Sequence, residues 1–166
     1  MMRDLVAALV ALALVIAALS LATTLHVWRR RRQGLHDRER ARGRVIVAEI
    51  PVGDELRLFS EDAARFYYGD QAIDKESIAA ARVLINGSPI AAVVSARHVR
   101  EAERHPTSFD DRPEGIARDR WDVAIETVGE TVLVECGAIR ERISQELARG
   151  VFDAVKNDVE QRNASS

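Results

Sequence analysis

The residues that could do chemistry gather between Arg97 and Arg120, and the clearest set is His98, Glu101 and His105. Their spacing of three and four would place the side chains on one face of a helix, where imidazole and carboxylate groups could ligate a metal ion. The segment is strongly charged and Pro106 follows at once, so a solvated polar helix explains the same pattern. Because a zinc site needs a further ligand or an open, supported geometry, we predict no metal and no cofactor.

Two other features could support catalysis. The paired carboxylates Asp110 and Asp111 could bind a divalent cation or act as acid and base, but their spacing matches no calcium loop and a solvated turn explains them. Cys136, the single cysteine, could be a nucleophile with His98 or His105 as its base, although it follows an apolar strand, where free cysteine packs as a small hydrophobe. The sequence contains no G-x-S-x-G, phosphate-binding glycine loop or H-E-x-x-H motif. We therefore predict that the protein is not an enzyme.

Four aromatic side chains are the candidate binding residues. Aromatic residues are enriched in protein interfaces, so this set could form a peptide-binding surface. Packing of strand residues in a core is the alternative explanation for the same residues. The candidates are Phe66, Tyr67, Tyr68 and Trp121.

The elements that must position these residues are short strands followed by a helix. Runs rich in β-branched and aromatic residues predict three strands, at Arg44–Ile50, Glu55–Glu61 and Arg65–Gly69. Two apolar runs around Asn86-Gly87 predict a hairpin over Ile78–Ala96, and Trp121–Cys136 repeats this pattern with its turn at Val128-Gly129-Glu130. From Ala138 the apolar residues recur every fourth position, at Ile139, Ile143, Leu147, Val151 and Val155. That period predicts one amphipathic helix, which frays from Asn157.

The order of these elements resembles bacterial pleckstrin-homology-like domains. Leu56–Val83 is similar to their early strands, and Gly129–Lys156 looks like their last strand and capping helix. Arg97–Arg120 departs from the family as a longer insertion. The resemblance implies an α+β fold, a small bent β-barrel or sandwich of about seven antiparallel strands closed by a C-terminal helix. It also implies binding of lipid, peptide or protein, without catalysis.

The amino-terminal segment predicts a membrane anchor. Leu5–Trp28 contains no charged residue, and at about 1.5 Å per residue a helix of that length reaches across a hydrocarbon core of roughly 30 Å. Four consecutive arginines follow, Arg29, Arg30, Arg31 and Arg32, and such basic residues stay on the cytoplasmic side. The alternative is an exported protein with a leader cleaved near Ser20-Leu21-Ala22. We expect a single-pass cell-membrane protein whose C-terminal domain is cytoplasmic.

Charge is distributed unevenly along the chain and bears on the choice of partner. Arg29–Arg44 carries a net +6, so with an overall charge of −2 the remainder carries −8. An acidic domain disfavours nucleic acid and anionic lipid headgroups. A protein partner is the better expectation, and Ala7/Ala11 and Ala18/Ala22 are compatible with a homo-oligomer through close helix packing.

The predicted organisation is a transmembrane anchor at residues 1–28, a basic juxtamembrane linker at 29–43, a pleckstrin-homology-like domain at 44–158 and a flexible tail at 159–166. The function we expect is a membrane-anchored binding or assembly module that presents its cytoplasmic domain to a protein partner. The alternatives are a membrane-tethered enzyme that uses the 97–120 insertion, and the exported protein.

Overall fold

A computed structural model describes residues 2–53, 55–104, 120–138 and 141–165. The chain divides into two compact units, Met1–Arg42 and Gly43–Ser166.

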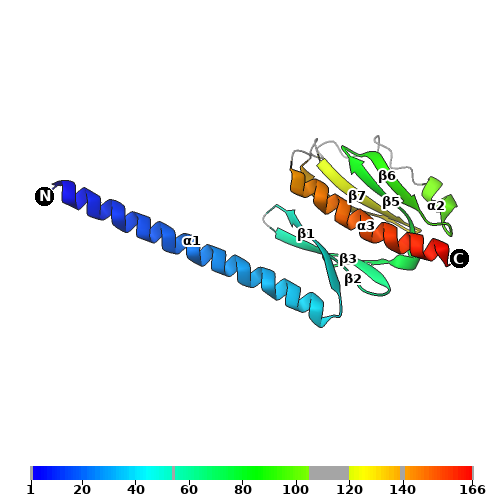
Figure 1. Ribbon diagram of the computed structural model, residues 1–166, viewed down its shortest axis with the longest axis horizontal. Helices are drawn as coiled ribbons and strands as arrows, with labels where there is room; N and C mark the ends of the chain where they lie inside the picture. Colours follow the sequence, from blue (N-terminus) through cyan, green and yellow to red (C-terminus); the bar gives the residue numbers. More distant parts are fainter. Residues whose placement is uncertain (1, 54, 105–119, 139–140, 166) are drawn as a thin grey trace. The chain divides into compact units, whose positions relative to one another are not determined.

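The first unit is a single α-helix, α1 (Met2–Ala41), which continues through the segment expected to be a basic linker (Figure 1). Among the residues that the structure describes, none of the helices combines the length and the apolar character that crossing a membrane requires. The predicted transmembrane anchor at Leu5–Trp28 is therefore wrong, and so is the single-pass localisation derived from it. Helix α1 instead runs without interruption from this uncharged segment into the arginines.

The second unit contains two four-stranded antiparallel sheets. Sheet A has the order β1-β2-β3-β4, with the strands β1 (Val45–Val52), β2 (Glu55–Glu61), β3 (Arg65–Tyr68) and β4 (Gln71–Asp74). Sheet B has the order β6-β5-β7-β8, with the strands β5 (Ile78–Ile85), β6 (Ser88–Val94), β7 (Arg120–Thr127) and β8 (Thr131–Ala138). The predicted fold of about seven strands behind a spanning helix is thus corrected to two sheets of four. Strand β4 was not predicted from the sequence, because it is only four residues long and buries only Ile73.

The hairpin of β5 and β6 is confirmed, and its turn follows from local chemistry. Asn86 and Gly87 both have positive φ values, 51° and 78°, as a two-residue turn of type I′ requires. The Asn86 side chain also accepts a hydrogen bond of 3.0 Å from the Arg120 N–H, which ties the turn to the start of β7. The turn therefore fixes the register of β6 on β5 and helps to dock β7 on the other side.

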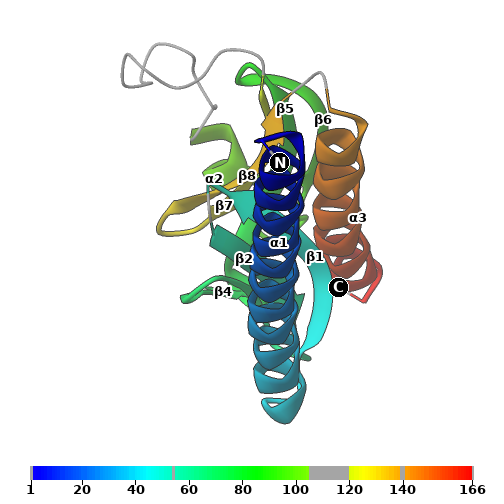
Figure 2. The same ribbon diagram turned by 90° about the vertical axis from the view of Figure 1, so that its left-hand side faces the viewer.

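The described residues of the second unit also form the 3-10 turn η1 (Lys75–Ser77), the short helix α2 (Val99–Arg104) and the long helix α3 (Arg142–Ala164). Figures 1 and 2 show α3 running along the sheets. It contacts β1 of sheet A and all four strands of sheet B, and it buries Val151, Val155 and Val159 among them. One core cluster therefore joins both sheets and the helix.

The structure changes the predicted helix at both ends. Its first residue is Arg142, and Ile143, which the period placed on the apolar face, is 67 % exposed. The next residue, Ser144, is buried instead of Ile143. The helix also continues to Ala164, through the region where fraying and a flexible tail were expected. Ile139, the first residue of the predicted period, lies outside the described residues.

Candidate functional site

The predicted metal and catalytic residues do not meet in a site that the structure describes. His105, Pro106, Asp110 and Asp111 lie outside the described residues, as does the side chain of Glu101. The ring Nε2 of His98 lies 2.9 Å from the carbonyl oxygen of Glu76, a structural contact with η1. Within the described part of the chain no group of three or more His, Cys, Asp or Glu side chains is arranged to hold a metal ion.

Cys136 is fully buried in the core between the sheets. Burial, and secondarily the charge of Asp122, raise the pKa of its thiol to about 12, although Arg120 opposes the shift. A thiol with this pKa is almost entirely protonated near neutral pH, and the thiolate is the nucleophilic form. The geometry therefore gives Cys136 a packing role.

The four aromatic candidates do not form an exposed surface. Phe66 is completely buried and stacks on Phe59 with ring centroids 5.6 Å apart. Tyr67 and Tyr68 are buried beside it in β3, and Trp121 packs partly buried against the same core cluster. Packing in the core thus explains Phe66, Tyr68 and Trp121. Tyr67 lies outside that cluster, and its hydroxyl donates to the Asp62 carboxylate at 2.7 Å.

The four membrane-proximal arginines lie on α1 with exposed side chains. Arg29 and Arg32 share one face of that helix with Gln33, His36, Asp37 and Arg40. The role predicted for them at a membrane surface stays a prediction.

Two buried carboxylates lie on β7, on the opposite side of sheet B from the main core. Glu126 is paired with Arg82 at 2.8 Å, and the Arg82 guanidinium also donates to the carbonyl of Ala102 in α2. Asp122 lies 2.8 Å from Arg120. Because each buried carboxylate has an arginine, these groups neutralise one another inside the fold and do not present a charged site.

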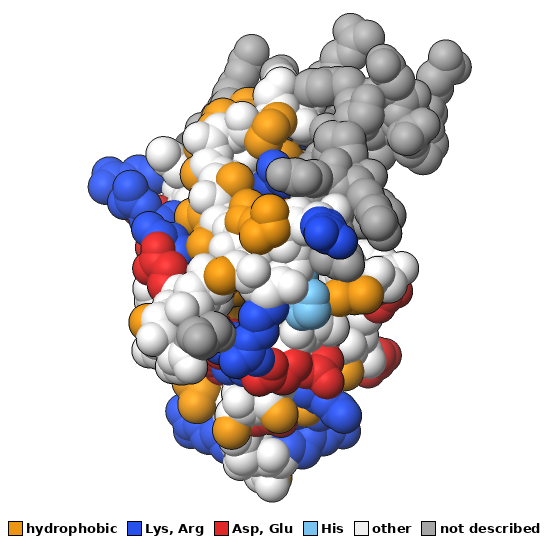
Figure 3. All heavy atoms as spheres, turned by 90° about the vertical axis from the view of Figure 1, so that its right-hand side faces the viewer, with side chains coloured by type: hydrophobic (Ala, Val, Ile, Leu, Met, Phe, Trp, Pro, Cys, Tyr) orange, Lys and Arg blue, Asp and Glu red, His pale blue; other side chains and the backbone are white. Residues whose placement is uncertain are grey.

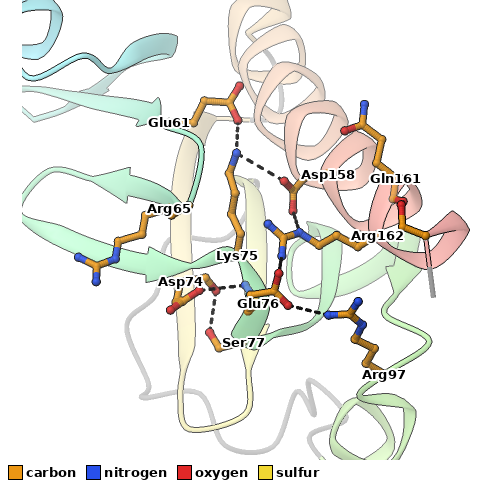
Figure 4. A network of polar contacts seen from close by, with 12 residues as sticks. Glu61, Arg65, Asp74, Lys75, Glu76, Ser77, Arg97, Asp158, Gln161 and Arg162 are labelled. Atoms are coloured by element: carbon orange, nitrogen blue, oxygen red, sulfur yellow. Dashed lines mark hydrogen bonds and ion pairs between the residues drawn. The ribbon is translucent and has the colours of Figure 1, made fainter.

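A polar network joins η1, the end of β2 and the last turns of α3 (Figure 4). The buried Lys75 ammonium lies 2.8 Å from Glu61 and 3.5 Å from Asp158, and it also sits over the Phe66 ring. Asp158 accepts in turn from Arg162 at 2.7 Å. With carboxylates on two sides, Lys75 is held as a structural cation that fastens α3 to sheet A.

One feature suited to binding is β6, an outer strand of sheet B. Among the described residues only β5 pairs with it, so its other side has no neighbouring strand. The Ser95 N–H donates to Ala79 of β5 at 2.8 Å. Since the backbone groups of alternate residues point to opposite sides of a strand, the N–H and C=O of Val94 and Ala92 point away from β5.

The side chains of β6 make this edge unusual. Its sequence, Ser-Pro-Ile-Ala-Ala-Val-Val, contains no charge. Ile90 is 56 % exposed and Val94 is 37 % exposed, and Val99 of α2 is exposed as well. Figure 3, which views the side of the molecule at the right of Figure 1, shows hydrophobic side chains above a band of basic and acidic ones. Proteins usually protect an exposed edge with charged side chains, and β6 has only Pro89 as such a device.

The strand β6 was predicted from the sequence, but its place at the edge of a sheet was not, because that place depends on pairing between distant segments. No family model, curated protein or solved structure matches this chain.

Proposed function

We propose that Gly43–Ser166 is a protein-binding module that accepts an extended segment of a partner protein as an additional strand on the outer side of β6. The observation that carries the proposal is a seven-residue edge strand without charge, with Ile90 and Val94 exposed. Strand addition takes its affinity from main-chain hydrogen bonds and its specificity from alternate side chains, and β6 offers both. The resemblance to pleckstrin-homology-like domains, which implies binding without catalysis, remains a prediction.

The charge balance supports a protein as the partner. Outside Arg29–Arg44 the chain carries −8, which opposes the approach of nucleic acid or of an anionic surface. Main-chain pairing with an uncharged strand is little affected by that charge. An extended peptide segment with apolar side chains on one face is the ligand that matches this edge.

The test uses the full chain in intact cells, with the photo-crosslinking residue p-benzoylphenylalanine at position 90. We expect a discrete crosslinked product with a partner protein. Ala92→Pro should abolish the product, because proline removes an N–H that points away from β5 and leaves the pairing with β5 intact.

Ala92→Ser is the matched control, since it changes the same residue and keeps the N–H. Thermal unfolding of both variants checks that they are folded. A product that survives Ala92→Pro as well as it survives Ala92→Ser would contradict strand addition at β6.

A further inference from the structure

The last turn of α3 already occupies part of the edge that we propose as the binding site. The side-chain amide of Asn163 donates to the carbonyl oxygen of Val94 at 3.1 Å, and its oxygen accepts from the N–H of Ala96 at 2.7 Å. In a parallel pair, one residue of the added strand donates its N–H to the carbonyl of residue i and accepts a hydrogen bond from the N–H of residue i+2. The Val94 carbonyl and the Ala96 N–H are such a pair. Asn163 therefore takes the place of a strand at this end of β6.

Ion pairs hold this turn in position. Arg162 bonds to Asp158 at 2.7 Å within α3 and also to the carboxylate of Glu76 in η1. Arg97, which follows β6, bonds to the same carboxylate at 2.7 Å. Figure 4 shows Glu76 between the two arginines. One glutamate thus links the end of α3 to the segment that Asn163 contacts.

We propose that the C-terminal turn of α3, Arg162 and Asn163, is an autoinhibitory latch on the β6 edge. This inference rests on the proposed function, because a latch needs an occupant to exclude. A partner strand that extends beyond Ala92 must displace Asn163 before it can pair with Val94 and Ala96. The latch therefore limits the length of edge that a partner can use, and its opening controls affinity.

The contacts of the latch are suited to reversible opening. They lie at the end of the helix, where local fraying has a low free-energy cost. The arginine pairs with Glu76 are partly open to solvent, so dissolved salt screens them. By contrast, Val155 and Val159 keep the preceding turns of α3 in the core when the last turn releases.

The experiment compares Asn163→Ala with Asn157→Ala in the full chain. The two variants make the same substitution in the same helix, and Asn157 is exposed. Amide hydrogen exchange measured by NMR provides the first readout. Asn163→Ala should speed exchange at Ala96 by roughly tenfold or more, whereas Ser95, bonded to Ala79, should be unchanged as an internal control.

Crosslinking through position 90 provides the second readout, and here Asn163→Ala should raise the yield roughly two- to tenfold over Asn157→Ala. An Ala96 amide that exchanges freely in the unmodified chain would overturn the latch. So would a yield that Asn163→Ala leaves unchanged while Ala92→Pro abolishes it, and the proposed function would then stand. If Ala96 is protected but no variant gives a product, the proposed function fails, and the latch has nothing to exclude.

Discussion

At the scale of single residues, burial decides what the ionisable side chains can do. Lys75, Asp122 and Glu126 are all buried, and each is placed beside a group of opposite charge. Pairing with an opposite charge offsets part of the cost of burying a charged group, so these residues are suited to a structural role more than to a catalytic one. Cys136 is buried in the same interior, and the charge of Arg120 does not offset the rise in the thiol pKa that burial causes.

We predict that Cys136 resists thiol reagents in the native protein. Its pKa of about 12 leaves almost no thiolate at pH 8, and the side chain is inaccessible. Ellman's reagent should react at pH 8 only after urea is added. Because the folded pKa lies above the unfolded one, this thiol should also make the fold less stable as the pH rises above about 9. Rapid reaction of the folded chain at pH 8, checked against a Cys136→Ala control, would contradict the assignment.

At the scale of elements, the junction between β8 and α3 depends on one glycine. Gly137 has φ +111°, and a Cβ atom added there would lie 2.6 Å from the Ser144 hydroxyl oxygen in the first turn of α3. Ser144 is itself buried, and its hydroxyl lies 3.3 Å from the Glu141 carboxylate. The close approach of strand to helix therefore requires a residue without a side chain.

We predict opposite effects of the same substitution at two glycines. Gly137→Ala should lower the free energy of unfolding by about 1 to 3 kcal/mol, because it adds a clash at a left-handed position. Gly150→Ala lies within α3, and its added Cβ meets no atom within 4 Å apart from the neighbouring helix backbone, so it should raise the free energy of unfolding by about 0.5 to 1 kcal/mol. Urea denaturation of both variants gives the two values. Equal effects at the two positions would show that the β8–α3 junction is not tightly packed.

Elements set by local chemistry could be predicted from the sequence, and those set by distant contacts could not. The turn at Asn86-Gly87 carries its own conformational preference, so the β5–β6 hairpin was correctly expected. The short β4 and the exact buried face of α3 depend on tertiary packing. Strand β4 was therefore not predicted, and the buried face of α3 was predicted one residue out of place at its start. The candidate site was beyond prediction for the same reason, since Asn163 meets Val94 across 69 residues of sequence.

At the scale of the whole molecule, Gly43–Ser166 should unfold as one unit. The main core cluster includes Phe66 of sheet A, Val123 of sheet B and Val155 of α3, so both sheets share it. Sheet B has in addition only a small alanine cluster with α2 among the described residues. The separate compact unit Met1–Arg42 is a helix with its own contacts. The two sheets are therefore expected to unfold together in one transition, independently of α1.

The chain offers a local reporter for each sheet. Both tyrosines lie in β3, and in a Trp28→Phe background the one remaining tryptophan, Trp121, lies in β7. We predict that near-ultraviolet circular dichroism of the tyrosines and fluorescence of Trp121 give the same urea midpoint. Phe66→Leu, in sheet A, should shift both midpoints equally, at a cost of about 1 to 3 kcal/mol. Separate midpoints would mean that the sheets unfold independently.

The strand order of sheet B also determines how the domain is made. Ile85 of β5 lies opposite Trp121 of β7, and about 35 residues separate them in the chain. The β5–β6 hairpin closes through a two-residue turn within microseconds, whereas β7 must first be synthesised, which at about 5 to 20 residues per second takes roughly 2 to 7 seconds. The nascent hairpin thus waits on the ribosome with both of its apolar edges uncovered. At this stage of biogenesis, before β7 and α3 emerge, the uncovered edges expose the chain to aggregation.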